Sequence, residues 1–492
     1  MDTQNNNIQI FALTDCHQEA RKLCCLFSGI IRRAPQNGKN TLVCDCGDLF
    51  KGIYDRDLCV ESYLKLRQQL PEAKIVFALG NNDFGFNHSG LEYLIQTSRT
   101  FNQANIHVLC ANLFDIQTEA YPKWVDPYIL LEINRKKILV TSFCVNYIHL
   151  HKFGLRLSDI SEAFLRLKDT IKHIRPDAFI ILNHALYPCC MDLYEIAAQN
   201  DIPVDLIIGG HEHAPLEPDT KHHIYYPRAF SRTMCCFDLK FSESRPEVTL
   251  TEMVSCKEEG VNPVFLPALA DYENTAGLNT PIAPSVLNLE RQYANPCAIG
   301  TFIADLMKNA GHADIALIST GYIVHALRYE ENKILTHYNV ERAFSSETPL
   351  QTVVLKAADL KEVFNNMLHY RYILQSGNTR FLQASQNITL ICHRTAENTG
   401  KVQQIFINGK PLFDDNGKAL HPDETFVCAI DPFIGAGELG FEAFRSLPKE
   451  TLMRNNQLVK IKNLFIKAVR EAPEKYAKGA SYPAYKIIDT ED

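Results

Sequence analysis

The sequence predicts an α/β fold for its N-terminal half, and three observations support this prediction. Short apolar runs rich in Ile, Val, Leu or Phe recur through the first 213 residues, as buried strands require. Stretches with one apolar helical face separate some of these runs, and a strand, helix, strand repeat is typical of α/β proteins. Each run is also followed within a few residues by Asp, Asn or His, which suggests that the strands share one functional edge.

Five runs are the expected strands, and they span residues 8–14, 41–46, 74–79, 178–182 and 205–208. Between the first two runs, apolar residues at helical spacing predict a crossover helix, and a second such stretch precedes Pro71. These apolar positions are Leu23, Leu26, Phe27, Ile30 and Ile31, then Val60, Tyr63, Leu64 and Leu66. Alternating apolar residues within 225–250 predict further short strands.

Residues of metal-binding types follow the five runs. They are Asp15 and His17, Asp48, Asn81, His184, and His211 and His213. Ligands of open α/β sheets bind outside the carboxyl ends of the strands, so these seven side chains are expected to converge. Mixed imidazole and carboxylate ligands suit Mn, Fe, Zn or Ni. The alternative is a set of turn residues and scattered histidines among the 17 in the chain, which would need five motifs to occur in order by accident.

The ordered series D-x-H, G-D, G-N, a single His and G-H-x-H resembles the calcineurin-like metallophosphoesterases. The resemblance implies a β-sandwich with flanking helices and two divalent metal ions (Mn, Zn, Fe, Co or Ni). It implies that Asp15, His17 and His213 hold one ion, that Asn81, His184 and His211 hold the other, and that Asp48 bridges them. A bridging carboxylate holds two cations about 3.5–4 Å apart, and such a pair can generate a hydroxide and clamp phosphoryl oxygens.

Length and composition restrict the function classes. The 492 residues suffice for two or three domains, and 46% hydrophobic with 22% charged residues is ordinary for a soluble globular protein. A net charge of -7 gives no global basic footprint for nucleic acid or an anionic membrane. No run reaches the roughly 18 apolar residues that span a bilayer. We therefore expect no nucleic-acid and no membrane partner, and the oligomeric state stays open.

The 16 cysteines favour a reducing compartment. Several are neighbours, such as Cys24 and Cys25, and adjacent cysteines cannot easily both find disulfide partners. We expect most of them to be small buried side chains. The polar N-terminus leads into a seven-residue apolar run, which is interpreted as a core strand and not as a signal peptide. The expected location is cytoplasmic, or periplasmic or secreted if the chain has been trimmed.

The chain is expected to form two domains. Residues 1–255 are the predicted metallophosphoesterase domain, residues 256–290 a linker with several prolines, and residues 291–492 the C-terminal domain. Segments 295–309, 313–317, 381–385 and 431–437 resemble the C-terminal domain of the 5′-nucleotidase family, which also includes 2′,3′-cyclic nucleotide phosphodiesterases. The resemblance implies an α+β domain that holds the base of a nucleoside between two aromatic rings. By position these rings are Phe381 and Phe433, and core packing is the alternative for both.

Four positions depart from the family pattern. Asn82 stands at the position of the family's catalytic His, and Gly85 at that of the Asp that orients it. An Asn side chain can donate a hydrogen bond but cannot supply a proton. Val324 and Leu439 replace the Arg and Asp that the family uses to contact the phosphate and the ribose.

Taken together, the sequence predicts a metal-dependent phosphoric ester hydrolase for a small phosphate ester, most simply a nucleotide. Asn82 and Asp48 are the predicted catalytic residues, and Phe381 and Phe433 the predicted substrate contacts. A phosphodiesterase for cyclic-nucleotide or non-nucleotide substrates is one alternative, because it fits the loss of the catalytic His and of the nucleoside contacts. A catalytically degenerate protein that keeps metal for structure or docking is the other, and the complete set of seven ligands disfavours it.

Overall fold

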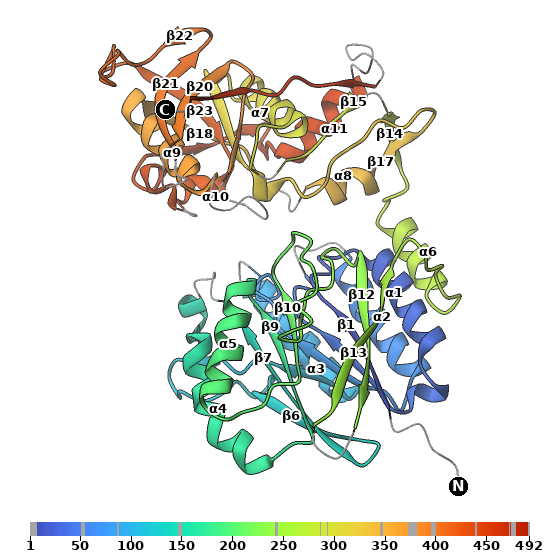
Figure 1. The fold of residues 1–492 in the computed structure, drawn as a ribbon. Helices are drawn as coiled ribbons and strands as arrows, with labels where there is room; N and C mark the ends of the chain where they lie inside the picture. The colour runs from blue at the N-terminus through green and yellow to red at the C-terminus, as the bar shows by residue number, and fades with distance from the viewer. Residues whose placement is uncertain are drawn as a thin grey trace. The chain divides into compact units, whose positions relative to one another are not determined.

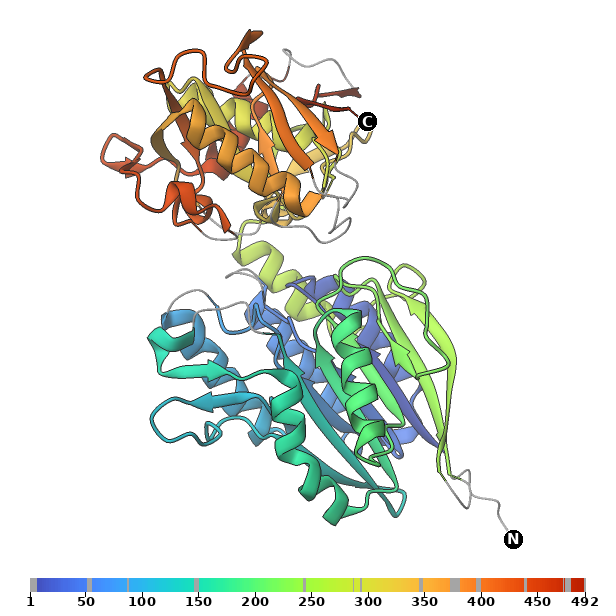
Figure 2. The ribbon, with the colours of Figure 1, turned by 60° about the vertical axis from the view of Figure 1, so that its left-hand side comes forward.

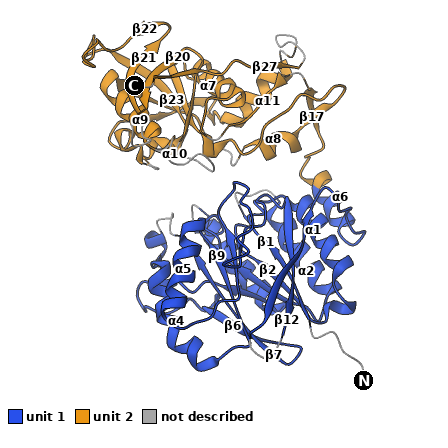
Figure 3. Ribbon diagram, in the orientation of Figure 1, with its two compact units in different colours: residues 1–272 blue, residues 273–492 orange. Residues whose placement is uncertain are grey.

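The computed structural model describes residues 7–50, 55–85, 88–145, 150–241, 245–285, 287–292, 294–344, 348–371, 381–394, 400–437, 440–471, 473 and 479–490. The chain divides into two compact units, Met1–Tyr272 and Glu273–Asp492 (Figure 3). Each unit has its own hydrophobic core. The division falls inside the predicted linker.

Unit 1 contains two mixed sheets (Figure 1). The first has the strand order β13-β12-β1-β2-β3-β4. Its strands are β1 (Ile8–Leu13), β2 (Thr41–Asp45), β3 (Lys74–Ala78), β4 (Ile106–Leu109), β12 (Thr233–Lys240) and β13 (Glu247–Ser255). Strands β1 to β4 are parallel, and β12 runs antiparallel to β1 and to β13. The carboxyl ends of β1, β2 and β3 therefore lie at one edge.

The second sheet of unit 1 has the order β11-β10-β9-β7-β6. Its strands are β6 (Tyr128–Ile133), β7 (Lys136–Cys144), β9 (Ala178–His184), β10 (Leu206–Gly210) and β11 (Ile224–Tyr225). All are parallel except β6, which runs antiparallel to β7. A small separate pair joins β5 (Leu113–Asp115) to β8 (Leu155–Leu157).

The two sheets pack face to face, and helices cover their outer faces (Figure 2). Helices α1 (Ala20–Arg33), α2 (Arg56–Gln69) and α3 (His88–Gln103) cover the first sheet, and α4 (Ile160–Ile174) and α5 (Tyr187–Gln199) the second. Alternate side chains of β1 serve the two sides: Ile10 and Ala12 lie between the sheets, and Phe11 and Leu13 lie under the helices. A strand that is buried on both faces has a continuous run of apolar residues in its sequence. The predicted sandwich with flanking helices is confirmed.

The predicted linker is largely structured. Phe265 and Leu269, before and within α6 (Leu266–Thr275), pack into the core of unit 1. Ile282 and Ala283 of β14 (Pro281–Pro284) pack into the core of unit 2. The segment was predicted as a linker with several prolines, but apolar side chains between them, such as Phe265, Leu269 and Ile282, are buried.

Unit 2 is an α+β assembly around a five-stranded sheet of order β19-β16-β23-β18-β24. Helices α7 (Ala298–Ala310) and α11 (Ile461–Glu471) pack on one face, and α9 (Ala357–Arg371) packs on the other. The strands are β16 (Ile315–Ser319), β18 (Gln351–Lys356), β19 (Leu382–Ala384), β23 (Thr425–Ile430) and β24 (Lys449–Thr451). A four-stranded sheet shares this core with α9. Its strands are β20 (Ile388–Arg394), β21 (Gly400–Ile407), β22 (Lys410–Pro411) and β28 (Lys486–Thr490).

Shorter elements complete the fold. They are η1 (Gln36–Gly38), η2 (Leu150–Phe153), β15 (Leu287–Asn288), η3 (Thr320–Tyr322), β17 (Ile334–Thr336), α8 (His337–Ala343), α10 (Pro432–Gly435), η5 (Glu442–Phe444), β25 (Met453–Arg454), β26 (Gln457–Leu458) and β27 (Ala480–Ser481). Among the described residues, no helix is both long enough and apolar enough to cross a bilayer.

All 16 cysteines are free, and all but Cys25 and Cys189 are buried. Burial raises the pKa of Cys235 to about 12, since a thiolate is poorly solvated there. The predicted role as small buried side chains is confirmed for most of them.

Candidate metal centre

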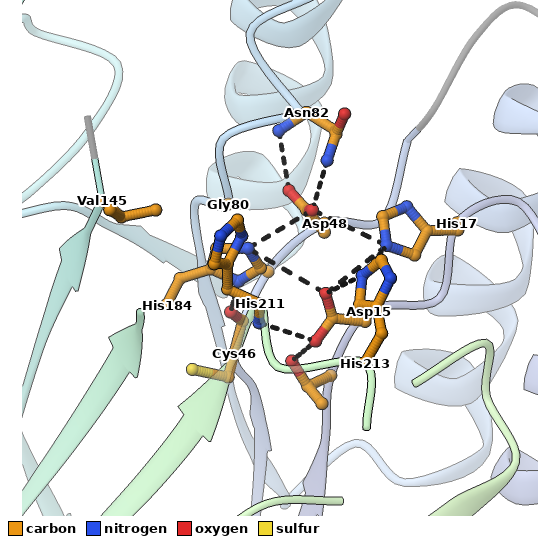
Figure 4. A network of polar contacts seen from close by, with 12 residues as sticks. Asp15, His17, Cys46, Asp48, Gly80, Asn82, Val145, His184, His211 and His213 are labelled. Atoms are coloured by element: carbon orange, nitrogen blue, oxygen red, sulfur yellow. Dashed lines mark hydrogen bonds and ion pairs between the residues drawn. The ribbon is translucent and has the colours of Figure 1, made fainter. Parts of the chain in front are cut away.

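The seven predicted ligands come from both sheets of unit 1. Asp15 and Asp48 follow β1 and β2, and Asn81 follows β3 after Leu79 and Gly80. His184 ends β9, and His211 follows β10 directly. The side chains of Asp15, His17, Asp48, His184, His211 and His213 face one another at this edge (Figure 4).

Four of these residues form a first group. One ligand atom from each of Asp15, His17, Asp48 and His213 lies within 4.8 Å of the others. The Nε2 atoms of His17 and His213 are 2.9 Å apart. Asp15 Oδ1 lies 3.4 Å from the first of these nitrogens and 3.2 Å from the second.

A second group contains Asp48, His184 and His211, whose ligand atoms also lie within 4.8 Å of one another. Asp48 Oδ2 lies 3.3 Å from His184 Nε2 and 3.7 Å from His17 Nε2. Asp48 thus belongs to both groups. Asn81 is buried, and its Oδ1 has no hydrogen-bond partner among the residues that the structure describes.

The residues of these two groups could bind divalent metal ions. A buried amide oxygen without a hydrogen-bond donor destabilises the folded state, unless another group, such as a cation, takes the place of water. Nε2 of His17, Nε2 of His213 and Oδ1 of Asp15 lie close together, so their lone pairs can converge on one cation. Imidazole, carboxylate and amide oxygen together suit first-row transition metals.

The electrostatics of the centre are dominated by two buried carboxylates. Burial alone would raise the pKa of Asp15, but His17, His184 and His213 outweigh it and hold that pKa well below its usual value. Burial lowers the pKa of His184, but the Asp48 and Asp15 carboxylates outweigh it and raise it to about 10. His211 differs, because burial and then the charge of His184 lower its pKa to about 3. Two ionised carboxylates buried together need positive charge nearby.

Hydrogen bonds behind Asp15 and His184 fix the orientation of these two predicted ligands. Asp15 Oδ2 accepts from Thr14 Oγ1 at 2.7 Å and from the His211 backbone N–H at 2.9 Å, which leaves Oδ1 facing the imidazoles. His184 Nδ1 lies 2.7 Å from the Cys46 carbonyl oxygen. A carbonyl only accepts, so Nδ1 carries the proton, and in the neutral ring Nε2 carries the lone pair. Such supporting contacts orient metal ligands in proteins.

The backbone of the centre is strained and tightly packed. Asp15, His17, Asp48 and His211 all have positive φ, at 47°, 48°, 58° and 71°. Side chains other than glycine rarely adopt this region, and such strain gathers at functional sites. A Cβ at Gly80 would lie 2.2 Å from Asp48 Oδ1, so the glycine of the G-N motif allows the two loops to meet.

Sequence reasoning assigned no role to Asp83. Its carboxylate is buried and accepts backbone N–H groups from Asp48 at 2.9 Å, Gly80 at 2.8 Å and Phe50 at 3.0 Å. It therefore ties the loop after β2 to the loop after β3. Burial and then the charge of Asp48 raise its pKa well above the usual value. Its place two residues after Asn81 was the available signal.

Sequence reasoning also assigned no role to Phe230. Its ring centroid lies 5.2 Å from that of His17 and 5.0 Å from that of His213. Its backbone N–H donates to the Asp15 carbonyl oxygen at 2.6 Å, and its φ is 64°. The ring therefore packs against two imidazoles of the first group. The segment before β12 carries no motif that the sequence analysis recognised.

Asn82 lies at the centre, but its donors face Asp48. Its side-chain Nδ2 donates to Asp48 Oδ2 at 2.6 Å, and its backbone N–H donates to Asp48 Oδ1 at 2.7 Å. Gly85 has a φ of 65°.

The two aromatic residues predicted to hold a base differ. Phe381 is fully buried in the core of unit 2, which favours core packing, the alternative to stacking on a base, for this residue. Phe433 is 41% exposed on α10. The buried Asp431 caps this helix: Oδ1 accepts from the N–H of Phe433 and of Ile434, and Oδ2 accepts from Ser319 N–H. Leu439 lies outside the described residues.

Comparison with known proteins agrees with this architecture. Residues 8–215 match the calcineurin-like phosphoesterase family, and residues 275–446 match the 5′-nucleotidase C-terminal domain. No curated protein sequence matches the chain significantly.

Solved structures resemble nearly the whole chain. A 5′-nucleotidase precursor from Thermus thermophilus has a TM-score of 0.74 at 15% identity, covering 98% of this chain and 99% of that one. The sulfate thiohydrolase SoxB from Thermus thermophilus has 0.71 at 14%, covering 95% and 82%. A putative 5′-nucleotidase from Staphylococcus aureus has 0.68 at 13%, covering 99% and 100%. At these identities the likeness is one of fold. The two family matches, in this order and over most of the chain, show that it belongs to the 5′-nucleotidase family, in which a calcineurin-like phosphoesterase domain precedes a 5′-nucleotidase C-terminal domain.

Proposed function

We propose that this protein is a metal-dependent phosphoric ester hydrolase whose substrates are small phosphate esters of the nucleotide class. The observation that carries the proposal is the pair of ligand groups that share Asp48. The substrate class is supported by the 5′-nucleotidase C-terminal match and by fold neighbours described as 5′-nucleotidases. Such an activity would place the protein in nucleotide breakdown.

The residues of the centre have distinct roles in this proposal. Asp15, His17 and His213 would hold one cation, Asn81, His184 and His211 the other, and Asp48 both. When bound, such a pair lowers the pKa of a coordinated water and stabilises charge on phosphoryl oxygens. Thr14 and the Cys46 carbonyl keep Asp15 and His184 in the orientation that ligation needs.

The direct test is hydrolysis of a panel of nucleotides and other phosphate esters with added Mn²⁺, Co²⁺ or Zn²⁺, and with a chelator as the control. We expect phosphate release that the chelator abolishes and that one of the metals restores. Tight metal binding without turnover of any ester would instead favour the degenerate, metal-retaining alternative.

An ester with a weakly basic leaving group, such as an aryl phosphodiester, is the second candidate substrate, and the contacts of Asn82 favour it. The backbone and side-chain nitrogens of Asn82 both donate to Asp48, and Asn cannot supply a proton to a leaving oxygen. A reaction without this proton favours esters whose leaving group is already a weak base.

Nucleoside binding by unit 2 should depend on Phe433. Base stacking on an aromatic ring is worth roughly 1–3 kcal/mol, so Phe433→Ala should weaken adenosine binding about 5- to 150-fold. Stacking discriminates poorly, so inosine and adenosine should bind with similar Kd values. Isothermal titration calorimetry measures both, with Leu420→Ala, an exposed apolar residue of the same unit, as the matched control. Tight adenosine binding that survives Phe433→Ala would contradict the assignment.

A further inference from the structure

We propose that Asn82 is a positioning residue that holds Asp48 in place, and that it does not act on the substrate. The proposal rests on the proposed function of the metal centre. Its basis is that one residue supplies two donors to the two oxygens of one carboxylate. Figure 4 shows both nitrogens of Asn82 directed at Asp48, while its amide oxygen points away.

The orientation of the Asn82 amide follows from chemistry. An ionised carboxylate only accepts, so the amide atom 2.6 Å from Asp48 Oδ2 must be the nitrogen. The Asp48 side chain is fully buried and needs such donors. Charge-assisted hydrogen bonds of this kind are about twice as strong as neutral ones.

The two hydrogen bonds from Asn82 leave Asp48 able to contribute to both ligand groups. Each carboxylate oxygen has two lone-pair sites, and Asn82 uses one on each oxygen. Each oxygen therefore keeps one site, two in total, and Oδ2 lies 3.3 Å from His184 Nε2 and 3.7 Å from His17 Nε2. Without the amide, the backbone N–H of residue 82 would hold only Oδ1, and Oδ2 would lose its hydrogen bond from residue 82.

The surrounding turn has no room for an Asp at position 85, and therefore none for a His–Asp pair at 82 and 85. Gly85 N–H donates to the Asn82 carbonyl oxygen at 3.1 Å and closes a tight turn. A Cβ at Gly85 would lie 2.8 Å from the Gly90 Cα, which is too close for two carbon atoms, and its φ of 65° would add strain for a residue with a side chain. An Asp cannot occupy position 85 without moving the start of α3. The two departures therefore belong together: the side chain at 82 has a ligand to hold, and the side chain that would orient a His is absent.

The expected result is a partial loss of metal affinity. Removing a contact that supports a ligand typically costs 10- to 100-fold in metal affinity, and Asn82→Ala should weaken Zn²⁺ or Mn²⁺ binding by about that factor. The loss is partial because the backbone N–H of residue 82 still donates to Oδ1. Asn82→Leu removes the donor at similar volume and should match Asn82→Ala. Asn82→His should not restore the parent affinity.

The measurement is competition against a chromophoric chelator on the full chain, with thermal unfolding of the chelator-treated protein as a folding check. Asn200→Ala, which removes another part-buried Asn whose Nδ2 bonds its own helix at Ile196, is the matched control and should leave affinity unchanged. A folded Asn82→Ala or Asn82→Leu that keeps parent affinity but loses kcat would overturn the proposal, because Asn82 would then act on the substrate. A parent protein that binds no metal would instead defeat the proposed function.

Discussion

Replacing Asp48 by Asn is expected to strip metal from the centre and to lower kcat/KM for any phosphate ester by at least about 10³-fold. Asp48 is the residue that belongs to both ligand groups, so losing its charge weakens both at once. The substitution also disrupts the hydrogen bonds from Asn82, since Asp48 accepts from the N–H and from Nδ2 of Asn82 through two oxygens. An amide at position 48 has one oxygen, so its own NH₂ would face a donor.

Elemental analysis of the purified variant and initial rates with added metal measure this result. Asp205→Asn is the matched control: Asp205 is also buried, but it lies before β10, at the end of that strand opposite His211, and pairs with Arg245. It should keep the parent metal content. Full metal occupancy in Asp48→Asn would show that the carboxylate does not bridge, and would leave the rest of the ligand set to be reassigned.

The fold of unit 1 was predictable because its strands are buried on both faces. Such strands produce apolar runs that local pattern alone detects, and the predicted runs match β1, β2, β3, β9 and β10 to within two residues at each end. Helix α1 was predictable for a related reason, since Leu23, Leu26, Phe27 and Ile30 form one face and are fully buried. The convergence of six of the seven predicted ligand residues followed from topology, because parallel strands bring their carboxyl ends to one edge.

What escaped prediction depends on contacts between distant segments. Phe230 packs against His17, which lies far away in the sequence, and against His213, and nothing local marks it. Phe381 and Phe433 each precede an aliphatic residue in a short motif, yet one is buried and the other is 41% exposed. Burial at such positions is decided by the layers that pack over them. The contacts of Asn82 were hidden for the same reason, because its partner comes from the loop after β2.

Hydrolysis by this protein should depend steeply on the leaving group. An aryl phosphodiester, whose leaving oxygen is a weak base, should be turned over much faster than AMP, whose ribose oxygen needs a proton as it departs. General acid catalysis contributes about 10²–10⁴-fold, and this is the handicap we expect for AMP relative to a family member with the catalytic His. The structural reason is that Asn82 cannot donate a proton and that its donors face Asp48.

A series of aryl phosphate esters with phenols of graded pKa gives the measurement, with kcat/KM plotted against leaving-group pKa and a chelator-treated sample as the blank. A steep negative slope is expected, since no proton from position 82 neutralises the negative charge that develops on the leaving oxygen. Asn82→Ala with metal restored to saturation is the matched variant. Its slope should equal that of the parent, because a positioning residue changes how much metal is held and not how the leaving group is protonated. A flat slope, or turnover of AMP as fast as that of an aryl phosphodiester, would mean that another group in the protein supplies the proton.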